Sequence, residues 1–543
     1  MGQAIDLTLC DAMVPSGSLD RSQLSTIDPL FQCRITDVQD SSCIAELQQF
    51  HAKPLYAIIY YRVWYLHSNM SSAYFWTIVA YMVFLIGVGA LRSRRVESQE
   101  DFSVAGRQLS TFVLFGTMLA TWIGTGSIFG FSGKIYEVGI AAWILPVGSQ
   151  IGIILLSFLA SRARRSSAIT VQDILETRYN KWARVFGVIT LVLTAVTIVS
   201  YQYRAAAAVL NLAMPSIDLK TATIIVAVFI IIYTALAGMF SVAYTDLVMG
   251  ITMIVGILVT LPYVYSKAGG YAGMAATLPP DHLVFFGPIS WVQAAGIILP
   301  PGLLILGDAN MYQRFFSARN AGVARRSTIW LLFGVAYMEW MIIATAWVCS
   351  AIEWQGGKLQ TPSRVIAYVA RDHLPIWLGA LVMTTIVAII VSTSISYLLV
   401  PATSIARDIY QRFINPKATE RKLVWLLRGL VIGLGIVAFI ISTFSEKFLE
   451  IALRAYTIYG TGITPSLVAA LTWKRASAPG AVTSIIMGVA TTLIWEFGGF
   501  GTSTGVDPVI PAIAVSVVCL IGVSLLTPAP RSEQVDVFFQ EGN

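Results

Sequence analysis

Charged residues are scarce in this chain, and their scarcity excludes an ordinary soluble protein. Only 12% of the 543 residues are Asp, Glu, Lys or Arg, whereas soluble domains contain about 25%. Hydrophobic residues make up 56%, and the mean hydropathy is +0.72. Apolar runs of about 20 residues, the length that a transmembrane helix needs, recur along most of the chain. We therefore predict an all-α polytopic membrane protein.

Residues that carry metal or enzyme chemistry are also few. The chain has four histidines and five scattered cysteines, which form neither a zinc-ligand pattern nor a disulfide framework. It has no phosphate-binding P-loop and no nucleophile elbow. The net charge of +7 does not require a nucleic-acid partner, because basic residues accumulate in cytoplasmic loops. We expect a non-enzyme that contacts the lipid bilayer and a small solute, with no nucleic acid and no obligate protein partner.

Residues 1–70 differ from the rest of the chain. They are mixed polar, show no clear period and lack the pattern of a signal peptide. We interpret Met70 as the natural start and the preceding segment as a gene-model extension, with a poorly ordered N-terminal tail as the alternative. Sequencing the N-terminus of the native protein decides between them. The transmembrane domain is expected over 71–528, followed by a cytoplasmic tail at 529–543.

From Met70 onward the apolar runs predict about thirteen spans. Their approximate bounds are 72–91, 109–132, 139–160, 183–209, 219–240, 245–267, 287–308, 328–351, 375–402, 424–444, 449–473, 478–498 and 508–527.

Basic residues alternate between the loops with a bias of roughly three to one, which places the richer set in the cytoplasm. The N-terminus is then outside and the C-terminus inside a plasma membrane (the inner membrane, if the cell is bacterial). The richer loops contain Arg92, Arg94, Arg95, Arg107, Arg162, Arg164, Arg165, Arg178, Lys181, Arg314, Arg319, Arg325, Arg326, Arg407, Arg412, Lys417, Arg421, Lys422, Lys474 and Arg475.

Two of the spans contain residues that interrupt helices. In the second, 120–127 reads ATWIGTGS; glycine weakens a helix interior, and Ser and Thr bond local backbone groups. In the seventh, Pro300, Pro301 and Gly302 lie within an apolar run and are followed by Gly307-Asp308, and proline removes a helical hydrogen bond. A broken helix is tolerated in a membrane where it is buried in protein or lines a wet cavity. The alternative is a helix that uses small residues for close packing.

The two interrupted spans lie five spans apart, so the units that contain them enter the membrane from opposite sides. This pattern is typical of an inverted repeat, with substrate and ion sites at the broken helices. We place the repeats at about 109–267 and 287–473. The arrangement favours a transporter over a channel or a membrane enzyme.

The ninth span has hydroxyls suited to a small cation. Ser392 and Thr393 are neighbours, and Ile389 lies on roughly the same helix face. With backbone oxygens of Ala120 and Ile123 they would form a five-oxygen cage without net charge, which suits Na⁺ better than Ca²⁺. The alternative is that the hydroxyls only bond across helices or to their own backbone.

With these motifs the chain resembles the sodium:solute symporter family, which includes proline, pantothenate, sialic acid, choline and glucose transporters. The resemblance runs from about Met70 to Pro528. It implies a LeuT-type fold with a 5+5 inverted repeat and two broken helices, secondary active transport, and a sodium site at Ala120, Ile123, Ile389, Ser392 and Thr393. The motifs that carry it are Gly106-Arg107, Ala120 to Ile123, Tyr233-Thr234, Ala237-Gly238, Tyr244 to Asp246, Gln313-Arg314, Ser392-Thr393 and Asp408 to Tyr410.

Some members of that family have a second sodium site, which would correspond here to Asp246 and Ser396. Ile395 stands where those members have another serine, so one hydroxyl is missing and Ser394 is the candidate to compensate. An aspartate also favours a helix N-terminus. We prefer the interpretation that Asp246 caps the sixth span.

Five residues are candidates for the solute site: Trp122, Thr125, Gln202, Arg204 and Asp308. Asp308 ends the second broken helix and leads the set. Arg204 lies inside the fourth span and needs a partner, either Asp308 or a solute carboxylate. Trp122 matches an aromatic residue of choline transporters. We interpret Glu339 and Glu496 as structural.

These observations predict a sodium-coupled symporter of a small polar organic solute. Arg204 and Asp308 have opposite signs, which favours an amino acid or a similar zwitterion. A choline-like cation, a sugar or a carboxylate is the alternative. An uncoupled channel or sensor on the same fold is the alternative class.

Overall fold

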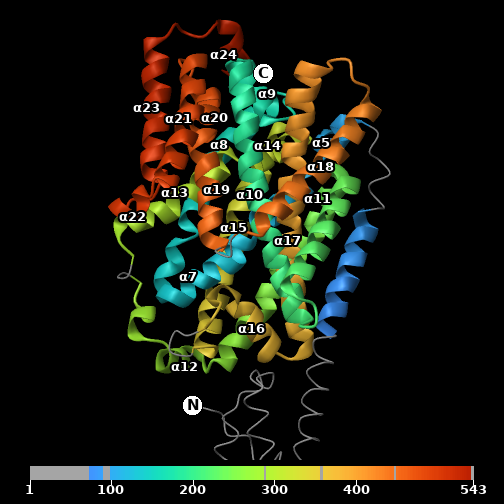
Figure 1. Cartoon of the computed structure of the whole chain (residues 1–543), viewed down its shortest axis with the longest axis vertical. Helices are drawn as coiled ribbons and strands as arrows, with labels where there is room; N and C mark the ends of the chain where they lie inside the picture. Colours follow the sequence, from blue (N-terminus) through green and yellow to red (C-terminus); the bar gives the residue numbers. More distant parts are fainter. Residues whose placement is uncertain (1–72, 90–97, 286–288, 355–358, 445–447, 540–543) are drawn as a thin grey trace, which may run out of the picture. The chain divides into compact units, whose positions relative to one another are not determined.

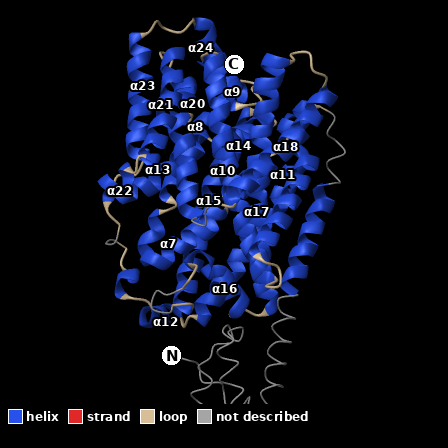
Figure 2. Ribbon diagram, viewed as in Figure 1, coloured by secondary structure: helices blue, strands red, loops and turns tan. Residues whose placement is uncertain are grey.

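Every regular element in the described part of the chain is helical. The computed structural model describes residues 73–89, 98–285, 289–354, 359–444 and 448–539. Helices and connecting loops fill this part (Figure 2). All of it belongs to the unit Ser71–Asn543. Residues 1–70, interpreted above as an extension, are not among the described ranges.

The helices follow the apolar runs of the sequence. In the first half they are Ala73–Gly89, α5 (Gln99–Val104), η3 (Ala105–Arg107), α6 (Thr111–Trp122), η4 (Gly126–Gly130), α7 (Phe131–Val138), η5 (Gly139–Ile144), α8 (Val147–Arg165), α9 (Val171–Arg178), α10 (Lys181–Ala213), α11 (Leu219–Lys267), α12 (Gly270–Thr277) and η6 (Pro280–Leu283). In the second half they are α13 (Trp291–Gly307), α14 (Ala309–Ser317), α15 (Ala321–Ile352), η7 (Pro362–Arg364), α16 (Val365–Asp372), α17 (Ile376–Ser404), η8 (Ile405–Ile414), α18 (Glu420–Ser442), α19 (Phe448–Gly462), α20 (Thr464–Thr472), α21 (Ala478–Phe497), α22 (Phe500–Thr504), α23 (Val509–Leu526) and α24 (Ser532–Phe539).

Within the described ranges, eight helices are long and apolar enough to cross a membrane, or nine if the bent pair 111–122 and 126–144 is one span. The count of about thirteen spans therefore stays a prediction. Part of the difference comes from α11, whose 49 residues would measure about 74 Å as one straight helix. Gly238 has a non-helical backbone (φ 66°, ψ 168°) and divides α11 into two helices. These correspond to two of the predicted spans.

Helix α17 forms the centre of the bundle, because its side chains are buried along almost the whole length. Helices α10 and α11 pack against it, and α8 packs against α13 and α15 (Figure 1). Helices α21 and α23 pack on each other and leave much of their surface exposed. The last two spans are therefore peripheral, and the centre is built from the predicted repeats.

Both predicted interruptions occur, and the second lies at Asp308, the end of the predicted stretch, instead of at the prolines. The helix breaks at Asp308, where ψ is 117°, and Pro300 and Pro301 lie inside α13. Proline at these positions leaves the carbonyl groups of residues 296 and 297 without helical donors. Gly296 and Ile297 line a large cavity, which is where freed carbonyls are tolerated.

Candidate functional site

The break after α6 presents backbone oxygens to α17. Helix α6 ends at Trp122, Ile123 has an extended backbone (φ −72°, ψ 109°), and helical structure resumes by Gly126 at an angle of 50°. The carbonyl oxygens of Ala120, Thr121 and Ile123 each lie within hydrogen-bond distance of a hydroxyl on α17. The break therefore supplies three oxygens to one place.

The Thr393 hydroxyl lies among three backbone oxygens, two from the break and one from its own helix. Its Oγ1 is 3.2 Å from Thr121 O, 3.0 Å from Ile123 O and 3.1 Å from Ile389 O. A hydroxyl has one proton to donate, so it bonds one of these oxygens at a time. Ile389 O also accepts a backbone hydrogen bond within α17, so the surplus lies in the two oxygens of the break. Such a surplus of carbonyl oxygens suits a cation.

Ser392 stands beside Thr393 and connects the break to an acidic side chain. Its Oγ is 2.9 Å from Ala120 O and 2.7 Å from Asp246 Oδ1. Ser392 and Thr393 are buried, with 0% and 3% exposure, so bulk water does not compete for these oxygens.

The structure thus brings together the five residues predicted to form the cage. Its oxygens are two hydroxyls and three carbonyls, a neutral set that suits a monovalent ion such as Na⁺. No group of three or more His, Cys, Asp or Glu side chains able to hold a metal occurs in the described ranges. The residues present therefore fit sodium, while multivalent ions lack their preferred ligands. The cage residues are Ala120, Ile123, Ile389, Ser392 and Thr393.

The interpretation of Asp246 as a helix cap is wrong. Asp246 lies within the second half of α11, well past the break at Gly238, and it is fully buried. Its Oδ2 accepts a hydrogen bond from the Thr117 hydroxyl at 2.6 Å, and its Oδ1 lies near Ser392 as described above. The carboxylate therefore bonds α6 and α17 instead of its own helix end.

Arg314 supplies the positive charge opposite Asp246. The sequence placed this arginine with the cytoplasmic loops, but it is buried on α14 with its Nη2 3.3 Å from Asp246 Oδ2. Nη2 also donates to Ser396 Oγ at 2.7 Å and to the Thr121 hydroxyl. The guanidinium group occupies the space between Asp246 and Ser396, the two residues expected at a second sodium site.

Thr125 and Gln202 meet at the restart of the broken helix. The Gln202 Oε1 accepts from the Thr125 backbone N–H at 3.2 Å and from the Thr125 hydroxyl. Gln202 Nε2 is buried and has no hydrogen-bond partner among the described atoms. A Cβ on Gly124 would lie 2.9 Å from this nitrogen and 3.0 Å from Thr393 Oγ1. The pair therefore packs directly against the cage.

Trp122 lies on the other side of the break, in a small cavity of about 20 Å³. Its indole Nε1 donates to Glu339 Oε1 at 3.1 Å, and its ring stacks on Tyr456 with 6.4 Å between centroids. The Ser149 hydroxyl donates to Glu339 Oε2 at 2.6 Å. The Glu339 carboxylate thus has two described hydrogen bonds, and both donors are neutral.

Asp308 and Arg204 are not partners, which corrects the pairing expected from their charges. Asp308 caps α14: its Oδ1 accepts from the Asn310 backbone N–H at 3.0 Å, and its Oδ2 accepts from the Tyr397 hydroxyl at 3.1 Å. Arg204 Nη1 donates to the Ser442 carbonyl on α18 at 3.0 Å. The helix N-terminus favours the negative charge of Asp308, and the arginine whose charge acts on Asp308 is Arg314, not Arg204.

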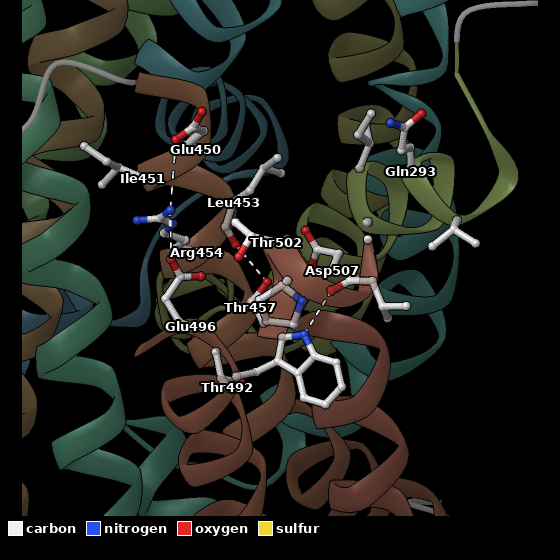
Figure 3. A pocket seen from close by; sticks show the side chains of 18 of the residues that line it. Gln293, Glu450, Ile451, Leu453, Arg454, Thr457, Thr492, Glu496, Thr502 and Asp507 are labelled. Atoms are coloured by element: carbon white, nitrogen blue, oxygen red, sulfur yellow. Dashed lines mark hydrogen bonds and ion pairs between the residues drawn. The ribbon is translucent and has the colours of Figure 1, made fainter. Parts of the chain in front are cut away.

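A cavity of about 860 Å³ adjoins the smaller one, and Ile297 and Leu453 line both. Figure 3 shows Arg454 between Glu450 and Glu496, with its Nη2 2.8 Å from Glu496 Oε1. Asp507 faces the same space from the end of the loop before α23. The larger cavity therefore extends towards the residues that surround Trp122.

Two broken helices in one bundle, the first of them beside a set of neutral oxygens, are the pattern of a secondary transporter of the inverted-repeat type. Residues 102–488 match the sodium:solute symporter family. The chain belongs to this family, and its relatives are transporters.

Curated relatives resemble the chain over most of its length. The osmoregulated proline transporter OpuE of Bacillus subtilis is 24% identical over 480 residues, covering 84% of this chain and 96% of the relative. The sodium/proline symporter of Escherichia coli is 23% identical over 482 residues, covering 84% and 93%. The high-affinity choline transporter 1 of Drosophila melanogaster is 24% identical over 377 residues, covering 66% and 60%.

Solved structures show the same fold. A substrate-bound, outward-open Na⁺-coupled sialic acid symporter superposes with a TM-score of 0.72 at 17% identity, covering 84% of this chain and 98% of that one. Mhp1, a nucleobase-cation-symport-1 family transporter, gives a TM-score of 0.55 at 13% identity, covering 80% and 97%. The LeuT-type architecture predicted from the sequence is confirmed.

Two charged residues of the site were not assigned to it from the sequence. Glu339 was interpreted as structural and Arg314 as a loop residue. Arg314 lies just before a run of basic residues and was therefore assigned to the same loop. The apolar pattern around Phe315 and Phe316 was an available signal that this arginine is buried. Glu339 lies in the middle of a span, a position that by itself indicates function.

Proposed function

We propose that this chain is a sodium-driven symporter that imports a small polar organic solute by alternating access. The observation that carries the proposal is the Thr393 hydroxyl with three carbonyl oxygens around it. Sodium in the cage would hold the broken helix α6 against α17 and so stabilise the solute site beside Trp122. Its entry is driven in part by the membrane potential, at about 2.3 kcal/mol per charge per 100 mV.

One sodium ion per cycle is the proposed stoichiometry. A second ion between Asp246 and Ser396 would have to displace the Arg314 guanidinium, which already neutralises the carboxylate. Ile395 also contributes no oxygen there. These contacts support a single site at the cage.

The proposed solute site surrounds the break in α6. Trp122, Thr125 and Gln202 adjoin the cage, and Asp308 and Arg204 remain candidates at its margin. An amino acid or similar zwitterion is the proposed solute class, because proline appears in the names of two relatives with high coverage. The choline transporter among the relatives keeps a choline-like cation as the alternative.

The proposed orientation has the N-terminus outside and the C-terminus in the cytoplasm of a plasma membrane. Helices α9 and α24 lie near one end of the bundle, and α12 and α16 near the opposite end (Figure 1). The loops at the α9 end carry the excess of basic residues, which favours the cytoplasm. This grouping supports the proposal.

Thermal stability of the purified protein tests the ion and the solute together. A ligand that binds only the folded state raises Tm by mass action. We expect a higher Tm in NaCl than in KCl at equal ionic strength, and a further rise with one solute from a set of L-proline, choline, D-glucose, pantothenate and sialic acid. Equal Tm values in the two salts would contradict sodium coupling.

Substitution of the cage hydroxyls tests the site itself. Ser392→Ala combined with Thr393→Ala should abolish sodium-dependent uptake into proteoliposomes while expression persists. Ser394→Ala is the matched control, because the Ser394 hydroxyl bonds only its own helix at Ile390 O, 2.7 Å away. Unchanged sodium dependence in the double variant rejects the site, and solute that fails to accumulate against its gradient indicates a channel.

A further inference from the structure

Glu339 is a buried carboxylate whose described partners are all neutral. It lies near the middle of α15 with 2% exposure, and its hydrogen bonds come from Trp122 and Ser149. The other buried carboxylates of the spans are compensated differently. Asp246 pairs with Arg314 and Asp408 with Arg184, while Asp308 caps a helix.

An uncompensated carboxylate inside a membrane protein is expensive. Hydrogen bonds from an indole and a hydroxyl stabilise the charge but do not neutralise it, and burying a charge is costly unless it is paired. Ionisable groups in transmembrane helices usually face partners, cavities or transported substrates. With neutral partners alone, a buried carboxyl group takes up a proton and is neutral. Glu339 lines the small cavity, and a cation bound there would supply the missing charge and keep the carboxylate ionised.

The walls of this cavity suit an organic cation. Trp122, Phe131 and Tyr456 provide three aromatic side chains, and much of the remaining lining is apolar. Aromatic faces attract cations, and quaternary ammonium groups in particular. A carboxylate with aromatic walls combines charge neutralisation with a surface for N-methyl or ring CH₂ groups.

Proximity to the cage strengthens the requirement for a carboxylate. Trp122 is adjacent to Ile123, whose carbonyl oxygen belongs to the cage. Sodium in a neutral cage repels a nearby positive solute group, and the negative charge of Glu339 offsets that repulsion. Two cations can then occupy neighbouring sites together, as symport of a positively charged group requires.

We propose that Glu339 is the counter-ion for a positively charged nitrogen of the transported solute, an alkylammonium group held against the rings of Trp122 and Tyr456 on the side that faces the small cavity. This inference rests on the proposed function, because it assigns the chemistry of its solute site. The cavity of about 20 Å³ holds about one water molecule. Entry of the solute from the larger cavity therefore requires Leu453 and Ile297, which line both spaces, to move apart.

Isosteric probe pairs on the full-length protein in NaCl test the inference. Choline is compared with 3,3-dimethyl-1-butanol, in which carbon replaces the charged nitrogen. L-Proline is compared with tetrahydrofuran-2-carboxylate, in which ring oxygen replaces it. We expect at least one of the two nitrogen compounds to raise Tm and its isostere to leave Tm unchanged. Equal effects within both pairs, or no effect of either nitrogen compound, would overturn the inference.

Glu339→Gln then tests the residue. The amide keeps the shape and an acceptor for Trp122 but removes the charge, and we expect affinity for the nitrogen compound to fall about 100-fold. Glu137→Gln is the matched control, because this exposed carboxylate lies outside the cavity and pairs with Lys134. Unchanged affinity in Glu339→Gln would overturn the inference.

The salt dependence separates this inference from the proposed function. A sodium-induced rise in Tm that persists in Glu339→Gln shows that the variant is folded and the cage intact. If wild-type protein binds choline or L-proline through Glu339 equally well in NaCl and KCl, sodium coupling is rejected and the inference stands. If sodium supports binding of D-glucose or sialic acid and of neither nitrogen compound, the inference is rejected and sodium coupling stands.

Discussion

Arg314 joins three parts of the bundle through one guanidinium group. Nε donates to the Thr117 hydroxyl on α6 at 3.1 Å, and Nη2 pairs with Asp246 on α11 and bonds Ser396 on α17. The Nη1 group donates to Asn310 O within α14 at 3.1 Å. The second broken helix is thereby fixed to the helices that form the cage.

A double-mutant cycle should show this coupling. Asp246→Asn alone leaves a buried arginine unpaired and should cost about 3–5 kcal/mol of folding stability, as should Arg314→Met. The double variant should lose less than the sum, because neither charge is left alone. The measurement is Tm in detergent at constant salt. Additive losses would show that the two charges do not stabilise each other.

At the scale of elements, the two repeats meet where α8 crosses α13. A Cβ on Gly148 would collide with the Ile298 carbonyl oxygen, one on Gly152 would lie 2.6 Å from Gly302 O, and one on Gly302 would lie 2.8 Å from Gly148 O. Small residues four positions apart let transmembrane helices approach closely. These glycines set the distance between the repeats.

Adding a methyl group at this crossing should destabilise the protein. We expect Gly148→Ala to cost about 1–3 kcal/mol, the usual range for overpacking. Gly433→Ala on α18 is the control, because nothing lies within 4 Å of a Cβ there. Thermal unfolding of both variants checks the difference, and equal Tm values would show that the crossing can relax.

An ion-pair network joins α9 to α10 and η8. Its α9 residues lie outside the candidate membrane spans. Arg184 bonds Asp173 at 2.6 Å and also pairs with Glu176, and Arg407 bonds Asp173 at 2.9 Å. Burial acts to raise the pKa of Asp173, but Arg407 and Arg184 outweigh it and hold the pKa below its ordinary value. The carboxylate therefore stays charged in the folded protein.

This shift predicts an acid-sensitive contribution to stability. Because the folded pKa is depressed, the contribution is present above the unfolded pKa of about 3.9 and is lost as pH falls through the folded pKa. The Tm gap between wild type and Asp173→Asn should be largest near pH 6 and should narrow towards pH 3. Asp536→Asn, at an exposed position on α24, should show no such gap. A gap independent of pH would contradict the assignment.

At the scale of the whole molecule, the orientation predicts which surfaces face the outside. In a background with the five cysteines replaced by serine, Tyr271→Cys on α12 should react with a membrane-impermeant maleimide in intact cells. Asp536→Cys should react only after permeabilisation, because α24 lies at the opposite end of the bundle (Figure 1). The reverse pattern would invert the proposed topology.

The sequence was sufficient for the helical class and the first break, because apolar runs and helix-weakening residues are local signals, while the sodium cage stays a prediction. The second break lies at Asp308, the end of the predicted stretch, because the prolines before it continue a helix where freed carbonyls reach a cavity. The partners of Arg314 lie far away along the chain, at residues 117, 121, 246 and 396, so local pattern could not reveal its burial. The same holds for Glu339, which meets Trp122 and Ser149 only through folding.

The hydroxyl of Ser392 has one proton and two described acceptors, Ala120 O and Asp246 Oδ1. In the proposed site, a cation bound by Ala120 O and Ser392 Oγ would repel that proton and turn the O–H bond towards Asp246. Asp246 would then accept a hydrogen bond on Oδ1 while its Oδ2 faces Arg314 on α14. Ion binding at the cage would in this way be coupled to the second broken helix through one carboxylate.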